Sequence, residues 1–91
     1  MTWTIEFARQ ALKDLKKSTP TEIQRLSDFL DDLEKMDDAR STGKAMQGAP
    51  RGRWRYRVGD YRIIVRILDQ ENIISVERFG HRKNIYEKNP F

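Results

Sequence analysis

The sequence contains no cysteine and a single histidine, His81, and these absences remove several kinds of site. Without cysteine there is no disulfide framework, no thiolate nucleophile and no zinc–thiolate centre. One histidine does not build a multi-histidine metal site, so we expect no metal and no cofactor. No apolar run reaches membrane-spanning length, and the first residues, MTWTIEF, lack the basic start and long apolar core of a signal peptide. We therefore expect a cytoplasmic protein with no membrane partner.

Recognisable phosphate-binding glycine motifs are also missing. The chain has neither a Walker-type loop nor the glycine fingerprint of dinucleotide-binding proteins, so a phosphate cradle at a helix N-terminus has no support. Acidic residues are plentiful before the middle of the chain, but their run is typical of a solvated helix face rather than a metal site. These residues are Asp28, Asp31, Asp32, Glu34, Asp37 and Asp38.

The length and the charge distribution set the remaining bounds. The chain has 91 residues, of which 37% are hydrophobic and 35% charged, as expected for one small, folded and highly charged domain over residues 1–91. Residues 1–50 carry eight Lys and Arg against nine Asp and Glu, whereas residues 51–91 carry ten against five. This asymmetry favours an anionic partner for the second half, without distinguishing RNA, DNA and an acidic protein segment.

Hydrophobic periodicity predicts a strand and two helices in the first half. Residues 3–7 alternate apolar and polar side chains, as in a half-buried strand. From Ala8 the period becomes helical, with an apolar face that includes Leu12 and a solvated face that includes Asp14. A second helix is expected at Pro20, because Thr19 and Glu22 have the spacing of a capping box. The two helices, joined by a short turn, should form an antiparallel hairpin.

The second half reads as a loop and three strands. Residues 37–53 contain three glycines and a proline without sustained periodicity, which predicts a long connecting loop of the kind that often carries function. Strands follow at Arg53–Val58, Tyr61–Leu68 and 72–79. The order β-α-α-β-β-β predicts an α+β fold, with an N-terminal strand and the helical hairpin packed on one face of a mainly antiparallel sheet.

Arginine alternates through the first two of these strands, on either side of a Gly59-Asp60 turn. Gly-X between alternating runs is typical of a hairpin with a type II′ turn. In that register one face of the sheet carries Arg53, Arg55, Arg57, Arg62 and Arg66. The opposite face carries Trp54, Tyr56, Val58, Tyr61, Ile63, Val65 and Ile67.

The arginine face has two interpretations. An antiparallel sheet often has one solvated side, which is the simpler one. However, this register places Arg57 opposite Arg62 and Arg53 opposite Arg66, and like charges placed directly opposite each other destabilise a sheet. Arginine also suits planar, bidentate contact with phosphate oxygens. The pattern therefore favours an anion-binding surface.

Cleavage of RNA is one chemistry that such a surface supports. The 2′-hydroxyl of RNA attacks its own phosphate, so the protein needs to hold the hydroxyl in line, stabilise charge on the phosphate and move two protons. Guanidinium groups supply the charge stabilisation. His81, Lys83 and Tyr86, which follow the last strand, are candidates for proton transfer.

The chain resembles toxins of the RelE/ParE superfamily in two stretches, GRWRYRVGDYRII at residues 52–64 and FGHRK followed by IY at residues 79–86. The resemblance implies a RelE-like fold and a toxin of a type II toxin–antitoxin pair, held inactive by a cognate antitoxin. RelE-like members cut mRNA in the ribosomal A site, without metal, by attack of the 2′-hydroxyl.

Site residues carried over from this resemblance are catalytic Arg55, Arg57, Arg62, Arg82 and Tyr86. Neighbouring basic residues expected to bind RNA are Arg53, Arg66, His81 and Lys83. RelE has lysines where this chain has Arg55 and Arg57, and an arginine cannot act as a base because it keeps its proton. Two alternatives stay open: a ParE-like DNA gyrase poison and a non-catalytic basic module that binds nucleic acid.

Overall fold

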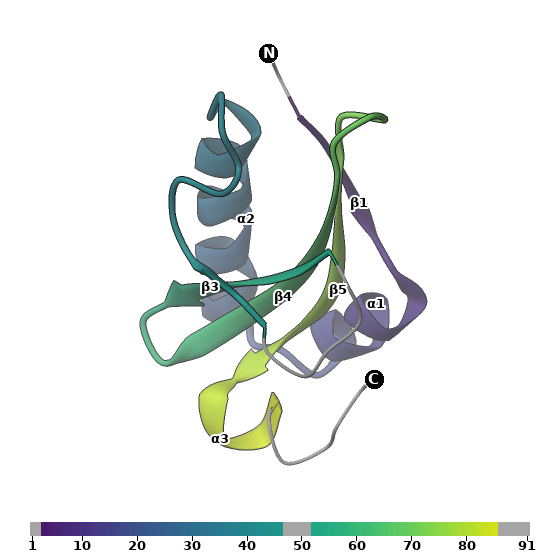
Figure 1. The fold of residues 1–91 in the computed structure, drawn as a ribbon. Coiled ribbons are helices and arrows are strands. Elements are labelled where there is room, and N and C mark those ends of the chain that lie inside the picture. Colours follow the sequence, from purple (N-terminus) through teal and green to yellow (C-terminus); the bar gives the residue numbers. More distant parts are fainter. Residues whose placement is uncertain (1–2, 47–51, 86–91) are drawn as a thin grey trace.

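The structure is a computed structural model, and it describes residues 3–46 and 52–85 (Figure 1). The elements along the chain are β1 (Thr4–Phe7), α1 (Arg9–Lys16), α2 (Pro20–Glu34), β2 (Lys44–Ala45), β3 (Arg53–Val58), β4 (Tyr61–Leu68), β5 (Ile73–His81) and α3 (Arg82–Ile85). The predicted α+β class is confirmed, since two helices pack on a five-stranded, mostly antiparallel sheet. The sequence did not indicate the short elements β2 and α3.

The sheet has the strand order β1-β5-β4-β3-β2. β1 pairs with β5 in parallel, and every other neighbouring pair is antiparallel. In this order β4 is the central strand. It is also the most apolar strand, and its central position agrees with its run of buried residues. The loop predicted at residues 37–53 contributes an edge strand, β2, where no strand was expected. Among the described residues, none of the helices is both long and apolar enough to cross a membrane.

The hairpin formed by β3 and β4 has the predicted register. Arg57 is opposite Arg62, and Arg53 is opposite Arg66. Gly59 has a φ of 59°, while Asp60 is not among the residues with positive φ, which is the pattern of a type II′ turn. The turn therefore fixes the register, and the register decides which side chains share a face.

One face of the sheet carries the hydrophobic core. Tyr56, Ile63, Val65 and Ile67 are buried there as predicted, and Trp54, Val58 and Tyr61 are partly buried against the same cluster. Figure 1 shows α1 and α2 on this side of the sheet, where α1 packs on β5 and α2 packs on β1 and β3. The opposite face of the hairpin is consequently left to the arginines.

Helix α2 begins where its capping residues predict. The Thr19 hydroxyl accepts a hydrogen bond from the Glu22 backbone N–H (3.2 Å), and the Glu22 carboxylate accepts one from the Thr19 N–H (2.6 Å). In α1 the predicted faces were wrong at two positions. Leu12 is 49% exposed, and Asp14 is buried. The reason is that α1 follows β1 along the sheet edge and directs Asp14 at β5, whose Phe79 N–H it accepts (3.0 Å).

Candidate functional site

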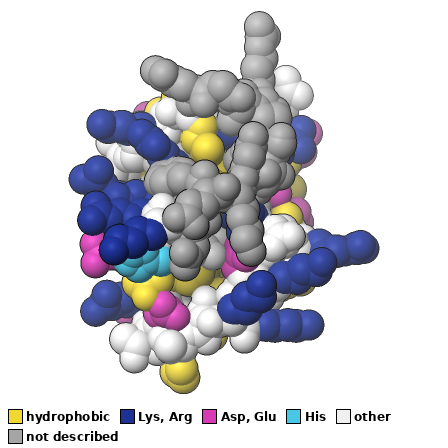
Figure 2. Space-filling model, turned by 90° about the horizontal axis from the view of Figure 1, so that it is seen from below, with side chains coloured by type: hydrophobic (Ala, Val, Ile, Leu, Met, Phe, Trp, Pro, Cys, Tyr) yellow, Lys and Arg dark blue, Asp and Glu magenta, His cyan; other side chains and the backbone are white. Residues whose placement is uncertain are grey.

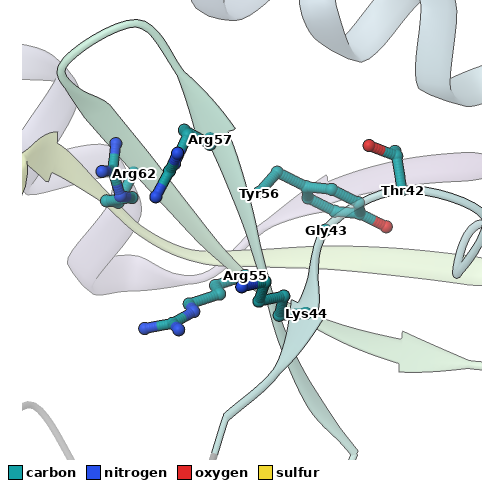
Figure 3. Close-up of a pocket in the computed structure, with 7 residues that line it drawn as sticks. All are labelled: Thr42, Gly43, Lys44, Arg55, Tyr56, Arg57 and Arg62. Carbon is teal, nitrogen blue, oxygen red and sulfur yellow. The ribbon is translucent and has the colours of Figure 1, made fainter.

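A groove of about 450 Å³ lies on the arginine face of the sheet (Figure 3). It is lined by Thr42, Gly43, Lys44, Arg55, Tyr56, Arg57 and Arg62, which come from β2, β3, β4 and the segment before β2. Four of these seven residues are cations, and none is acidic. Clustered positive side chains around a hollow of this size form a candidate site for an anionic ligand.

Arg62 is the most buried of the four cations that line the groove. It is 8% exposed, and its Nη1 donates to the carbonyl oxygens of Gly59 (3.1 Å) and Tyr61 (2.9 Å). Both carbonyls belong to the hairpin turn, so the turn itself orients the guanidinium. Within residues 3–46 and 52–85, no carboxylate forms an ion pair with Arg62. A nearly buried charge without a counter-charge is costly, and a bound anion would offset that cost.

Arg55 and Arg57 extend the positive lining along β3. Arg57 is exposed and faces Arg62 directly across the hairpin, while Arg55 is half-buried and pairs with Lys44 of β2. Figure 3 shows the four cationic side chains on one side of the hairpin, with the Tyr56 ring directed away from them. The alternation along β3 thus separates cations from core, as the sequence indicated.

Arg53 and Arg66 lie on the same face but do not line the groove. Arg53 forms an ion pair with Glu77 (3.3 Å), and both side chains are 15% exposed. Glu77 reaches this face because a bulge interrupts the pairing of β4 with β5 at Ile64 and Val65, leaving Glu77 outside the register. At this end of the hairpin the neighbouring strand β5 therefore supplies a carboxylate to the arginine face. Arg66 is exposed.

The C-terminal candidates lie near the hairpin turn. The backbone N–H of Arg82 donates to the carbonyl oxygen of Asp60 (2.9 Å), which places the start of α3 beside the turn. The Arg82 and Lys83 side chains are exposed and do not line the groove. Tyr86 lies outside the described residues. Figure 2, which views the molecule from below the orientation of Figure 1, shows one group of Lys and Arg side chains at the left and a second group at the lower right.

His81 is directed to the other face of the sheet. It is opposite Tyr61 in the register of β4 and β5, and the two rings meet edge to face with centroids 5.7 Å apart. Its Nδ1 accepts a hydrogen bond from the Lys83 backbone N–H (3.2 Å). Tyr61 belongs to the core side, so the imidazole lies apart from the groove cations.

The loop at residues 37–53 was expected to carry function, but sequence reasoning named none of its residues before Arg53 as site residues. The Trp54 indole donates to the Thr42 carbonyl (2.8 Å), and the Tyr56 hydroxyl donates to the Ala39 carbonyl. Gly43 has a φ of +85°, and a Cβ there would lie 2.4 Å from the Arg55 carbonyl oxygen. These contacts hold the segment against β3 and bring Lys44 into the lining. The available signal in the sequence was Gly43 directly before Lys44 in a long loop, which indicates a close backbone contact beside a cation.

Neither described tyrosine near the turn offers a phenolate. Burial raises the pKa of Tyr56, whose hydroxyl is held by Ala39. The pKa of Tyr61 is raised first by its hydrogen bond to the Glu22 carboxylate. Over the described part of the chain, no three His, Cys, Asp or Glu side chains cluster as metal ligands. The groove therefore offers fixed positive charge as its main chemical resource.

Comparison with known proteins gives consistent matches over almost the whole chain. Residues 5–86 match the family model described as ParE toxin of type II toxin–antitoxin system, parDE. Toxin RelG of Mycobacterium tuberculosis is 29% identical over 89 residues, covering 97% of this chain and 100% of that protein. The crystal structure of the toxin–antitoxin complex RelBE2 from Mycobacterium tuberculosis is similar with a TM-score of 0.80 and 27% identity, over 92% of this chain and 95% of that chain. The crystal structure of the RelB–RelE antitoxin–toxin complex from Methanococcus jannaschii is similar with a TM-score of 0.71 and 26% identity, over 90% of this chain and 95% of that chain.

Proposed function

The chain belongs to the ParE toxin family of type II toxin–antitoxin systems, within the RelE/ParE superfamily. We propose that it is a ribosome-dependent endoribonuclease that cuts messenger RNA. The cut is made by the 2′-hydroxyl of the message, which attacks the adjacent phosphate without a metal ion. Loss of translated message then inhibits protein synthesis. The observation that carries the proposal is the cationic groove, in which Arg62 is fixed by the turn and none of the seven described lining residues is acidic.

The arrangement of charges supports phosphate chemistry. Attack by the 2′-oxygen adds negative charge to the non-bridging phosphate oxygens, and donors that are already oriented stabilise that charge without reorganisation. Arg62 meets this condition because two turn carbonyls orient its guanidinium. In the proposed mechanism Arg62 and Arg82 carry the phosphate charge, and Arg55 and Arg57 position the RNA backbone.

Other basic residues have supporting roles in this proposal. Lys83 and Arg66 are exposed and suit contact with RNA outside the groove. Arg53 and His81 contribute less, because the first is paired with Glu77 and the second contacts Tyr61. Tyr86 is assigned to stacking on a base or to proton transfer.

Proposed partners follow from the family and from the similar structures. Two of these structures are toxin–antitoxin complexes, so we propose a cognate antitoxin for this chain as well. An antitoxin that neutralises the groove would need acidic side chains, since the groove is cationic. The ribosome, with mRNA in its A site, is the proposed target in the cytoplasm.

A ParE-like gyrase poison is the second candidate, favoured by the family model that matches. The two functions predict different products. A ribonuclease yields discrete cuts in translated message when ribosomes are present, whereas a gyrase poison leaves RNA whole and traps cleaved DNA. A non-catalytic basic module gives neither product, and its binding to nucleic acid falls steeply with salt.

The decisive experiment maps 5′ ends of message in a translation extract to which the protein has been added. We expect discrete cuts with the wild type and about 100-fold slower cutting with Arg62→Ala, as when one oriented charge donor is removed. Arg9→Ala is the matched control, because Arg9 is an exposed arginine on α1, away from the groove. Intact message with every protein, together with cleaved DNA in a parallel gyrase reaction, would replace this function by the second candidate.

A further inference from the structure

Lys44 differs chemically from the other cations of the groove. The remaining three are Arg55, Arg57 and Arg62, whose guanidinium groups do not give up a proton in proteins. An ammonium group is able to donate its proton and regain it during a reaction. Tyr56 is unsuitable, because its hydroxyl is held by Ala39 and Figure 3 shows its ring directed away from the cations.

The position of Lys44 is fixed by several contacts, although β2 has only two residues. Lys44 pairs with Arg55 across β2 and β3, so the two side chains share the groove face. On one side Gly43 fits against the Arg55 carbonyl with no room for a Cβ, and the Thr42 carbonyl accepts the Trp54 indole N–H. The backbone around Lys44 is therefore anchored, while the Lys44 side chain itself is exposed.

The groups that face Lys44 from neighbouring strands are all positive. Arg55 and Arg57 come from β3, and Arg62 comes from β4. Within the described ranges, no carboxylate forms an ion pair with Lys44. No anion of the described residues therefore holds the ammonium, which is available to a ligand in the groove.

We propose that Lys44 is the general acid of the groove, an assignment that rests on the proposed ribonuclease function. As the 2′-oxygen forms its bond to phosphorus, the bond between phosphorus and the 5′-oxygen breaks, and the Lys44 ammonium gives its proton to that 5′-oxygen. The 2′-hydroxyl loses its proton to solvent, and the neutral Lys44 amine regains one from solvent. The products are a 2′,3′-cyclic phosphate and a 5′-hydroxyl, so the step balances without a further reactant.

The test uses ribosomes programmed with two messages that differ in one atom. One message has the normal 5′-oxygen at the cut position, and the other has a bridging 5′-sulfur, which leaves as a thiolate without needing an acid. On the oxygen message, Lys44→Ala and Lys44→Arg should both cut about 100-fold or more slowly in single turnover. On the sulfur message both should cut at the wild-type rate.

Two controls separate proton donation from charge and from folding. Arg57→Ala removes a positioning charge and should be slow on both messages. Lys13→Arg, at an exposed position on α1, should match the wild type on both. Thermal unfolding of each variant verifies that the protein is folded.

The outcomes separate this assignment from the function on which it rests. If Lys44→Arg cuts the oxygen message at the wild-type rate, charge alone suffices and the assignment is wrong. It is equally wrong if the Lys44 variants stay slow on the sulfur message, or if Tyr86→Phe is the variant that sulfur rescues. A wild-type protein that cuts neither message refutes the ribonuclease function itself, and the assignment with it.

Discussion

Asp14 is expected to be among the most sensitive positions for stability, although it lies far from the groove. Its Oδ2 accepts from Arg78 Nε (2.8 Å) and from the Phe79 backbone N–H (3.0 Å). The Asp14 and Arg78 side chains are 9% and 13% exposed. Asp14→Ala would leave the Arg78 guanidinium and the buried Phe79 N–H without their acceptor, at a site with little access to water.

The magnitude follows from burial, and the chain provides its own control. Breaking a buried ion pair by removing one partner costs about 3–5 kcal/mol. The Arg40–Asp69 pair has the same closest distance, 2.8 Å, but its side chains are 37% and 60% exposed. Exposed pairs contribute about 0–1 kcal/mol, so Asp69→Ala should change stability little. Each substitution removes one aspartate carboxylate from an ion pair with an arginine. The two sites differ in how far the remaining arginine is buried.

Urea unfolding of the wild type, Asp14→Ala and Asp69→Ala measures the difference directly. For a domain of this size a loss of about 4 kcal/mol lowers the urea midpoint by about 2 M or more, with an unchanged slope. Adding Arg78→Met to Asp14→Ala should recover part of the loss, since the stranded charge is then removed. If Asp14→Ala and Asp69→Ala unfold within about 1 kcal/mol of each other, the argument from burial is refuted.

Two further predictions concern the loop before β2 and the start of α2. Gly43→Ala should cost about 1–3 kcal/mol in urea unfolding and slow message cleavage, because alanine is strained at a φ of +85° and its Cβ would meet the Arg55 carbonyl; a variant as stable as the wild type would contradict this. Glu22→Gln should reduce the decrease in the free energy of unfolding that occurs as the pH is lowered. The pKa of Glu22 is lowered, first by the Thr19 backbone N–H and then by the Tyr61 hydroxyl, so its contribution is present above the unfolded pKa of about 4.3 and disappears as the pH falls through the lower folded value. Urea midpoints between pH 2 and pH 6 measure the effect, and identical acid profiles for variant and wild type would refute it.

The hairpin could be predicted from the sequence because its information is local. Alternation assigns each residue to a face, and the Gly59-Asp60 turn sets which residues are opposite each other. The Arg57–Arg62 pair followed from those two rules, and the structure has it. The same holds for the start of α2, where Thr19 and Glu22 lie three residues apart and cap the helix reciprocally.

Contacts between distant segments were not predictable in the same way. Glu77 reaches Arg53 because a bulge shifts β5 by one residue, and no turn rule specifies a bulge at that point. Helical periodicity placed Asp14 on the solvated face of α1. Its burial depends on the position of α1 beside the part of β5 that extends past β1, where the Phe79 N–H donates to Asp14. The place of Lys44 in the groove lining depends on tertiary contacts made by Trp54 and Gly43. The segment before β2 has no hydrophobic periodicity from which those contacts could be predicted.

The placement of acids explains why the positive charge is concentrated at one end of the hairpin. Two pairs of arginines face each other across β3 and β4, and each pair carries a repulsive cost. At the end far from the turn, Glu77 offsets that cost by pairing with Arg53. At the turn end, no described carboxylate pairs with Arg57 or Arg62, and two backbone carbonyls hold Arg62 in place instead. Carbonyl dipoles orient a guanidinium without cancelling its charge, so the turn end keeps an unneutralised field for an incoming phosphate.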